Sequence, residues 1–255
     1  MKRLRFLLFL AWRDFVSVYK GSVLGWFWGV VEPAAYALIA FFFFEFVIGG
    51  SASRGQPYAK YVLPVLLAWM TVTTALQSSV TTISQYQALL SEQFDLRLLA
   101  AVKLLPIVCI HVAILSVLMG VFWISSSAGS LSISLFVYAL VCLVAILTGV
   151  FWIVMSLAPF VKDIRNIVGV GLQFGFWVAP IFWERSQFPG LLSWIMVMNP
   201  FHYPLQTYRV AFVGVVDAQA FLFESVYFWV VTLSILYFGS RIFARSKAHF
   251  GDVLT

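Results

Sequence analysis

Long apolar stretches separated by short polar segments dominate this sequence. A helix needs roughly 20 mostly apolar residues to cross the hydrocarbon core of a bilayer. Six stretches satisfy or approach this requirement, at about residues 27–48, 61–83, 104–124, 131–157, 164–182 and 221–242. The second is the most polar, with several Thr and Ser residues. The pattern predicts an all-α integral membrane protein with six transmembrane helices, built as a single domain over residues 1–255.

The first 25 residues follow a different pattern, that of an amphipathic helix. One helical face carries the apolar residues Leu4, Leu7, Leu8, Ala11, Phe15 and Val18, and another carries Arg13, Ser17 and Lys20. Such a helix lies in the plane of the membrane interface. A signal peptide is a poorer interpretation, because the run "FLLFLA" is short and no small-residue cleavage site follows it. We expect residues 1–25 to form a cytoplasmic interface helix.

Proline and charged residues interrupt the apolar region before the last span. Pro180, the pair Glu184–Arg185, the pair Pro189–Gly190 and Pro200 break the stretch from Phe174 onward. Irregular backbone at membrane depth is tolerated where protein or a water-filled cavity covers it. We therefore expect an external re-entrant region over residues 183–216. It would contain two short helices, "LLSWIMVM" and "PLQTYRVAFV", joined around Asn199–Pro200.

Charge and composition agree with this topology. The chain is 62% hydrophobic and 10% charged, whereas about a quarter of the residues of a soluble domain are charged. With both termini inside, twelve Lys and Arg residues lie on the cytoplasmic side and four lie outside: Arg54, Lys60, Arg185 and Arg209. The net charge of +6 thus reports topology, and we expect no nucleic-acid partner.

Motifs for chemistry are absent from the sequence. It contains no G-x-x-x-x-G-K-[ST], H-E-x-x-H or G-x-S-x-G and no Cys/His cluster, so we expect no cofactor or metal in this chain. Cys109 and Cys142 are interpreted as small core residues, and His111 as a hydrogen-bonded core histidine. Glu32 fits a snorkelling residue and a functional one equally well. A membrane enzyme would need an acid–base pair, and the nearest candidates, Glu184 and His202, have no supporting motif.

Aromatic residues make up 18% of the chain. Some of them fit an interfacial belt. The group Phe174, Phe176, Trp177, Phe182, Trp183 and Trp194 is denser than a belt requires, and aromatic faces can stack on the apolar faces of sugars. The segment Gln87–Lys103 is polar and helix-compatible. It fits either an ordinary solvated loop or a short helix that docks on a cytoplasmic partner.

Three stretches together resemble ABC-2-type permeases. They are "WRDFVSVYKGSVLGWFWGVVEP" (Trp12–Pro33), "KDIRNIVGVGLQFGFWVAPIFW" (Lys162–Trp183) and "MNPFHYPLQTYR" (Met198–Arg209). Their order and spacing hold over nearly the whole chain, and they are most similar to permeases that export lipid-linked O-antigen polysaccharide, then to capsule and teichoic-acid exporters. An ABC-2 permease for small hydrophobic drugs or lipids shares the architecture. The loop "SEQFDLRLLA" departs from the family, because it lacks a Phe-Pro pair and carries two acids.

The resemblance implies a homodimer in the bacterial inner membrane. Two separate ATPase subunits would bind ATP and Mg²⁺, and the substrate would be a polyprenyl-linked polysaccharide in contact with membrane lipid. The implied channel residues are Tyr36, Phe43, Phe174, Trp177, Phe182 and Trp183. The implied external gate consists of Trp194, Asn199, Pro200, Tyr203 and Arg209. The implied ATPase-coupling residues are Arg13, Asp14, Tyr19, Lys20, Glu92, Asp95 and Arg97.

Overall fold

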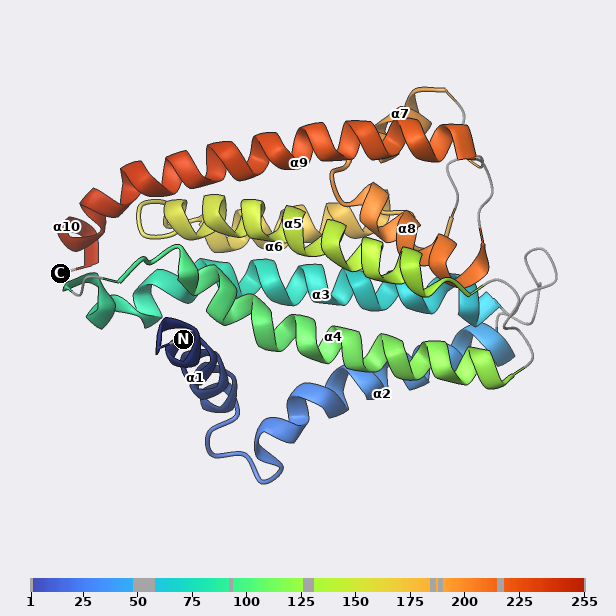
Figure 1. The fold of residues 1–255 in the computed structure, drawn as a ribbon, viewed down its shortest axis with the longest axis horizontal. Coiled ribbons are helices and arrows are strands. Elements are labelled where there is room, and N and C mark those ends of the chain that lie inside the picture. Colours follow the sequence, from blue (N-terminus) through green and yellow to red (C-terminus); the bar gives the residue numbers. More distant parts are fainter. Residues whose placement is uncertain are drawn as a thin grey trace.

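The computed structural model describes residues 2–47, 58–91, 94–125, 131–183, 187, 190–214 and 218–254, and regular structure within these ranges is helical. Most of the long helices run along one common direction (Figure 1). The helices are α1 (Lys2–Val18), α2 (Trp28–Phe42), α3 (Tyr58–Gln85), α4 (Leu98–Ile124), α5 (Ile133–Leu157), α6 (Ile164–Val178), α7 (Leu191–Met198), α8 (His202–Val213), α9 (Ala218–Ser246) and α10 (Phe250–Leu254). Short 3-10 helices cover Gly25–Phe27, Gln87–Ser91 and Lys247–His249, and a π-helical turn, Phe43–Val47, extends α2.

Five helical segments in the described ranges are long and apolar enough to cross a membrane. They cover Gly25–Val47, Tyr58–Gln85, Leu98–Ile124, Ile133–Leu157 and Phe221–Val253. They confirm five of the six predicted spans, with ends shifted by up to 11 residues. The sixth predicted span, at residues 164–182, is not confirmed, because α6 has only 15 residues and rises about 22 Å. Pro180 explains this early end: it forces Ala179 into an extended conformation (φ −69°, ψ 147°).

Helix α3 forms the centre of the bundle. Five other helices pack against it: α2, α4, α5, α6 and α8. Most of its residues are buried, in contrast to α2, α4 and α9, whose membrane-spanning windows are largely exposed. A helix surrounded by protein can carry polar side chains at membrane depth, since neighbouring helices shield them from lipid. This position accounts for the buried residues Thr71, Ser79 and Thr82 of the second apolar stretch.

The two short helices predicted before the last span are present. α7 covers the segment "LLSWIMVM", and α8 covers "PLQTYRVAFV" with two more residues at its start. The side chain of Asn199 accepts a hydrogen bond from the backbone N–H of Phe201 at 3.0 Å, which fixes the turn between them. α8 is buried between α3 and α5, whereas several side chains of α7 are exposed.

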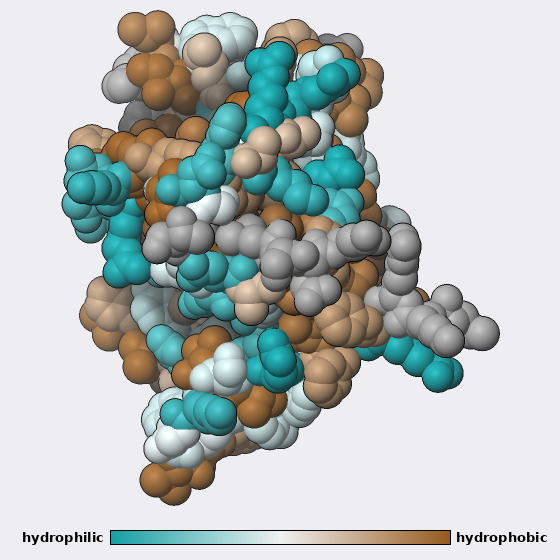
Figure 2. Space-filling model, turned by 90° about the vertical axis from the view of Figure 1, so that its left-hand side faces the viewer, coloured by the Kyte–Doolittle hydropathy of each residue, from teal (hydrophilic) through white to brown (hydrophobic). Residues whose placement is uncertain are grey.

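One end of the bundle holds α1, the C-terminal segment and the turns that join α3 to α4 and α5 to α6 (Figure 1, left). We call it the terminal end. Viewed from outside, hydrophilic side chains gather across it (Figure 2). Its exposed charged residues include Asp95, Arg97, Lys162, Asp163, Arg165, Lys247 and Asp252. This mixed charged surface is the end predicted to be cytoplasmic.

Candidate functional site

A stripe of polar side chains runs along the terminal half of α3. Thr74, Gln77 and Ser84 are exposed and Thr73 and Thr81 are half-buried. Their spacing of three or four residues places them on one face of the helix. Exposed hydroxyl and amide groups are unfavourable against lipid. The Thr and Ser hydroxyls already donate to carbonyl oxygens of α3 itself, so the exposed amide of Gln77 is the group of the polar stripe that most favours water, a second chain or a polar ligand in front of it.

The polar stripe lies between the sides of α3 that meet α6 and α2. On one side, the ring of Trp69 packs so closely on α6 that a Cβ added at Gly175 would lie 2.7 Å from it. On the other side, Thr74 and Ser78 line a cavity shared with α1, α2 and α4. Successive residues of a helix are rotated by about 100° around its axis. On this basis the stripe residues lie at angles between Trp69 on the α6 side and Ser78 on the cavity side, so the stripe faces outward between these two contacts.

Exposed aromatic side chains of α2 and α6 lie beyond the polar stripe, toward the end of the bundle opposite the terminal end. Tyr36 and Phe43 are about half-exposed on α2, and Phe174 and Trp177 of α6 are 71% and 62% exposed. Phe174 and Trp177 are three residues apart and Tyr36 and Phe43 are seven apart, so the two members of each pair share a helical face. These four predicted channel residues therefore point away from the core of a single chain.

The remaining predicted channel residues, Phe182 and Trp183, belong to the turn after α6. Phe182 packs against Phe44 of the α2 extension, with ring centroids 5.6 Å apart. Trp183 stacks on Trp177, with centroids 6.0 Å apart and ring planes 20° apart. The structure thus joins Trp177, Phe182 and Trp183 in one aromatic cluster at the end of α6, opposite the terminal end.

Arg209 was predicted at the external gate, but its side chain is buried in α8. The guanidinium donates hydrogen bonds to the carbonyl oxygens of Pro180, Ile181 (2.8 Å) and Trp183 (3.4 Å). It also stacks on Tyr61 of α3, 3.8 Å from the ring centroid. Arg209 therefore fastens the non-helical turn after α6 to α3 and α8, and so holds the aromatic cluster in place.

The other predicted gate residues are divided between surface and core. Trp194 is exposed on α7. Asn199 and Pro200 form the half-buried turn between α7 and α8. Tyr203 is buried, and its ring stacks on Phe228 of α9 with centroids 5.1 Å apart. Tyr203 is thus a packing residue between α8 and α9.

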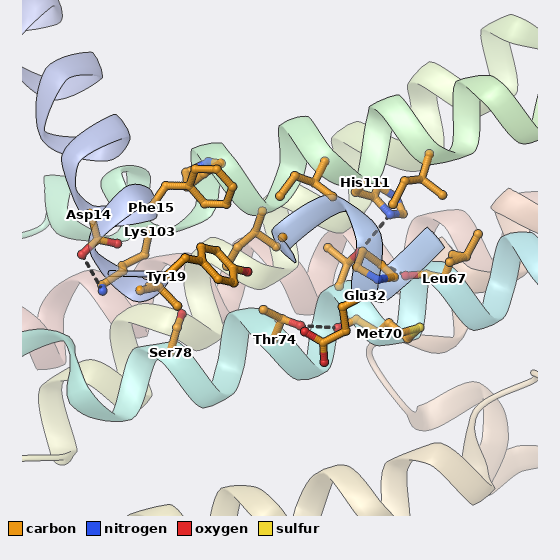
Figure 3. Close-up of a pocket in the computed structure, with 18 residues that line it drawn as sticks. Asp14, Phe15, Tyr19, Glu32, Leu67, Met70, Thr74, Ser78, Lys103 and His111 are labelled. Atoms are coloured by element: carbon orange, nitrogen blue, oxygen red, sulfur yellow. Dashed lines mark hydrogen bonds and ion pairs between the residues drawn. The ribbon is translucent and has the colours of Figure 1, made fainter. Parts of the chain in front are cut away.

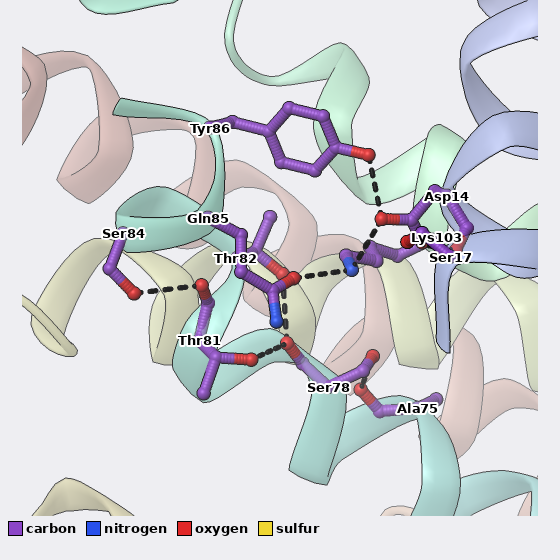
Figure 4. Close-up of polar contacts among 10 residues, drawn as sticks. All are labelled: Asp14, Ser17, Ala75, Ser78, Thr81, Thr82, Ser84, Gln85, Tyr86 and Lys103. Carbon is purple, nitrogen blue, oxygen red and sulfur yellow. Dashed lines mark hydrogen bonds and ion pairs between the residues drawn. The ribbon is translucent and has the colours of Figure 1, made fainter. Parts of the chain in front are cut away.

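The predicted coupling residue Asp14 is the centre of a buried polar network at the terminal end (Figure 4). Its Oδ1 accepts hydrogen bonds from Lys103 Nζ of α4 at 2.8 Å and from the Tyr86 hydroxyl at 2.7 Å. Lys103 also donates to Gln85 Oε1 at 2.6 Å. Burial raises the pKa of Tyr86, and its hydrogen bond to Asp14 raises it further. Four side chains thereby connect α1 to the end of α3 and the start of α4.

Other predicted coupling residues lie at the surface of the terminal end. Arg13 and Lys20 are exposed. Partial burial raises the pKa of the half-buried Tyr19, and the negative charge of Glu32 adds to the effect. Asp95 and Arg97 form two side-chain hydrogen bonds of 3.1 and 3.0 Å. The hydrogen bond from Arg97 lowers the pKa of Asp95.

The segment Gln87–Lys103 contains a short helix, and its docking on a cytoplasmic partner stays a prediction. A 3-10 helix covers Gln87–Ser91, and α4 begins at Leu98. Glu92 lies outside the described residues.

Two candidates for chemistry are resolved by their surroundings. His111 is buried and hydrogen-bonded to Thr71 (2.9 Å) and to the Tyr208 hydroxyl (2.8 Å), so the core interpretation is confirmed. His202 is buried 3.7 Å from Glu224 of α9, and Glu184 lies outside the described residues. No group of three potential metal ligands occurs among the described residues. Cys142 is buried, but Cys109 is exposed on α4, so its assignment to the core is wrong.

Sequence reasoning missed the polar stripe and the partners of Asp14. The stripe had a signal, because Thr73, Gln77, Thr81 and Ser84 recur at helical spacing. Lys103 also had one, as a lysine within the apolar run "LLAAVKLLP", but it was counted only as a topology signal.

Comparison with known proteins identifies the architecture. Residues 5–213 match the family described as ABC-2 type transporter. The chain belongs to this family. It is similar to two O-antigen export system permease proteins RfbA of Klebsiella pneumoniae. One is 23% identical over 247 residues and the other 22% over 246, and each alignment covers 95% of this chain and 92% of the relative.

Family membership defines the general role of this ABC-2 protein. It is a multi-pass membrane subunit of a transporter, and its family works with an ATPase subunit. The surfaces described above therefore divide by position. The polar stripe and the aromatic residues of α2 and α6 are candidates for substrate contact, and the terminal end is the candidate for contact with the ATPase.

Proposed function

We propose that this ABC-2 protein is the permease of an ATP-driven exporter that moves lipid-linked, O-antigen-like polysaccharide across the bacterial inner membrane. The observation that carries the proposal is the outward surface of α3 between α2 and α6, on which the polar stripe occupies the terminal half and the exposed aromatic residues of α2 and α6 follow toward the other end. The similarity to two O-antigen export permeases along nearly the whole chain supports the same substrate class.

This combination of side chains matches the chemistry of a sugar polymer. Pyranose rings present C–H groups on their faces and hydroxyl groups at their edges. Aromatic rings suit the faces, while Gln77 and the Thr and Ser oxygens can hydrogen-bond to the edges. Each such contact contributes about 1 kcal/mol. Contacts of this strength exchange readily, so a chain much longer than the membrane is thick can advance one segment per ATPase cycle.

A second copy of the chain would complete the channel. In one chain the polar stripe is open along its length, and the aromatic faces of α2 and α6 are exposed. A homodimer that covers these faces would enclose the stripes of both copies and remove them from lipid. Two ATPase subunits, carrying ATP and Mg²⁺, would bind at the terminal end on the cytoplasmic side, near Arg13–Lys20 and residues 90–98. Both termini would then be cytoplasmic.

The alternatives differ in the substrate. A capsule or teichoic-acid exporter would use the same stripe, since its substrate is also a long polar chain. A permease for small hydrophobic drugs or lipids fits less well, because exposed Gln77, Thr74 and Ser84 give no advantage for an apolar substrate. The two short helices α7 and α8 would form the external end of the pathway.

Complementation of a strain that lacks the gene tests the proposal. We expect the deletion to abolish surface polysaccharide, and Gln77→Leu and Trp177→Ala to reduce its recovery at equal amounts of membrane protein. Trp123→Ala is the matched control, because Trp123 is similarly exposed on α4, away from the polar stripe. Normal surface polysaccharide in the deletion strain would refute the substrate. Equal export by all three variants would refute the stripe as the pathway.

A further inference from the structure

Three cavities follow one another along α4, the first beside α1 and the other two beside α2. The first, of about 550 Å³, lies at the terminal end and includes Arg13, Lys20 and Lys103 in its lining. The second, of about 290 Å³, lies between α1, α2, α3 and α4. The third, of about 410 Å³, is an apolar groove between α2 and α4 with α3 as its floor. Neighbouring cavities share lining residues, so the three lie end to end, and we call them together the path.

The chemistry of the path changes along its length. Arg13 and Lys20 give the first cavity a net positive charge, because Asp14 balances Lys103. The second cavity has a polar side, with Glu32 and Thr74, that Figure 3 shows between the Asp14–Lys103 pair and His111. Its α4 side carries Lys103 and His111 and is otherwise apolar, with Pro106, Ile107, Ile110 and Ile114. The third cavity is lined only by hydrophobic residues of the Ala, Val, Leu, Ile and Phe types.

The length of the path selects the occupant. Along α4 it extends from Lys103 to Phe122, which is roughly 28 Å at about 1.5 Å per residue. One leaflet contributes only about half of the 30 Å hydrocarbon core. An acyl chain anchored at the cytoplasmic surface would therefore end near the second cavity. Only a longer chain fills the groove as well.

We propose that this path binds the polyprenyl phosphate end of a lipid-linked substrate. The phosphate lies beside Arg13 and Lys20, where the charge is complementary, and away from the carboxylate of Glu32. The polyprenyl chain follows the apolar side of α4 and occupies the groove between α2 and α4. This inference rests on the lipid-linked substrate class proposed above.

The position of the path relative to α2 gives the site its role. Ala34, Ala37 and Leu38 face the groove, while Tyr36 and Phe43 lie on another face of the same helix. The lipid chain would thus remain on one side of α2 while the polysaccharide passes on the other. Helix α2 would separate the apolar and polar parts of one substrate.

Lipid binding by the purified full-length chain, without ATPase or sugar, tests the inference. Native mass spectrometry would follow displacement of a long-chain polyprenyl monophosphate by geranyl monophosphate or phosphatidylglycerol. We expect both competitors to be at least tenfold weaker. Ala34→Trp should block binding, whereas Ala35→Trp, which is exposed next to it but outside the groove, should not.

Charge removal provides a second test that does not alter packing. Arg13→Gln with Lys20→Gln should weaken binding about 30-fold, which corresponds to about 1 kcal/mol for each lost charge. Arg5→Gln, on the same helix and outside the path, should have no effect. Equal binding of phosphatidylglycerol, or equal effects of the Ala34 and Ala35 variants, would overturn the inference. Export is measured in cells, whereas lipid binding is measured on the purified chain. A failure of the export proposal can therefore be told apart from a failure of the lipid-binding inference.

Discussion

The buried Asp14–Lys103 pair should contribute more to stability than any exposed ion pair of this chain. Its side chains are only 11% and 7% exposed, and Nζ lies 2.8 Å from Oδ1. Removal of one partner from a buried pair leaves the other charge in a medium of low polarity, at a cost of about 3–5 kcal/mol. Because Gln85 and Tyr86 remain as neutral partners, we expect about 3 kcal/mol for Lys103→Met and a similar value for Asp14→Leu.

The double variant Asp14→Leu with Lys103→Met separates the interaction energy of the ion pair from unrelated destabilisation by each substitution. With both charges removed, no buried charge lacks a partner, so the double variant should lose less stability than either single variant. The coupling energy would then be at least about 3 kcal/mol, far outside the error of additive effects at independent sites. Reversible unfolding of the purified chain in mixed detergent micelles, followed by tryptophan fluorescence, measures all three values.

The Asp95–Arg97 pair is the matched control. It has comparable hydrogen-bond lengths, but its side chains are 45% and 47% exposed, and exposed pairs contribute about 0–1 kcal/mol. Arg97→Met should therefore change stability by less than about 1 kcal/mol. If the losses of the Asp14 and Lys103 variants add in the double variant, or fall to the level of the control, the reasoning from burial is wrong.

Further predictions concern packing, pH and the anchor of the aromatic cluster. Gly175→Ala should destabilise the chain by about 1–3 kcal/mol, because the new Cβ would lie 2.7 Å from a tryptophan ring of α3; Gly171→Ala, with nothing within 4 Å in the same helix, should not. The raised pKa of Tyr86 means that its stabilisation is complete below about pH 10, the unfolded pKa, and declines above it. Tyr86→Phe should therefore flatten the alkaline part of a pH–stability profile, and an unchanged profile would contradict this. Arg209→Met should cost about 3 kcal/mol and shift Trp183 fluorescence, whereas an unshifted spectrum would show that Arg209 does not hold the cluster.

Much of the fold could be predicted from local sequence properties. Length and apolarity predict five spans directly, and the breaks at Pro189–Gly190 and Pro200 predict α7 and α8. The end of α6 was also encoded locally, since Pro180 disfavours a helical conformation at Ala179. The predicted span nevertheless continued to residue 182 because hydropathy was given more weight than backbone conformation.

The tertiary partners could not be predicted in this way. Asp14 and Lys103 are 89 positions apart. Each is a charged residue near a predicted cytoplasmic helix end, and such residues occur there whether or not they form an ion pair. Arg209 looked like an outer-surface charge, but its side chain is in the core, where it donates hydrogen bonds to three carbonyl oxygens of the turn after α6. Whether a charge faces solvent or completes a buried network depends on the helices around it, which periodicity does not specify.

The glycines Gly149 and Gly239 have a mechanical consequence. Helices α5 and α9 approach so closely there that a Cβ at Gly239 would lie 2.7 Å from the carbonyl oxygen of Gly149. Backbones in direct contact leave little freedom for sliding or tilting. Together with the buried α8, these helices form a stiff frame, while α2 and α6 each attach mainly to α3. Work delivered by ATP hydrolysis would then move α2 and α6 against that frame rather than deform the whole bundle.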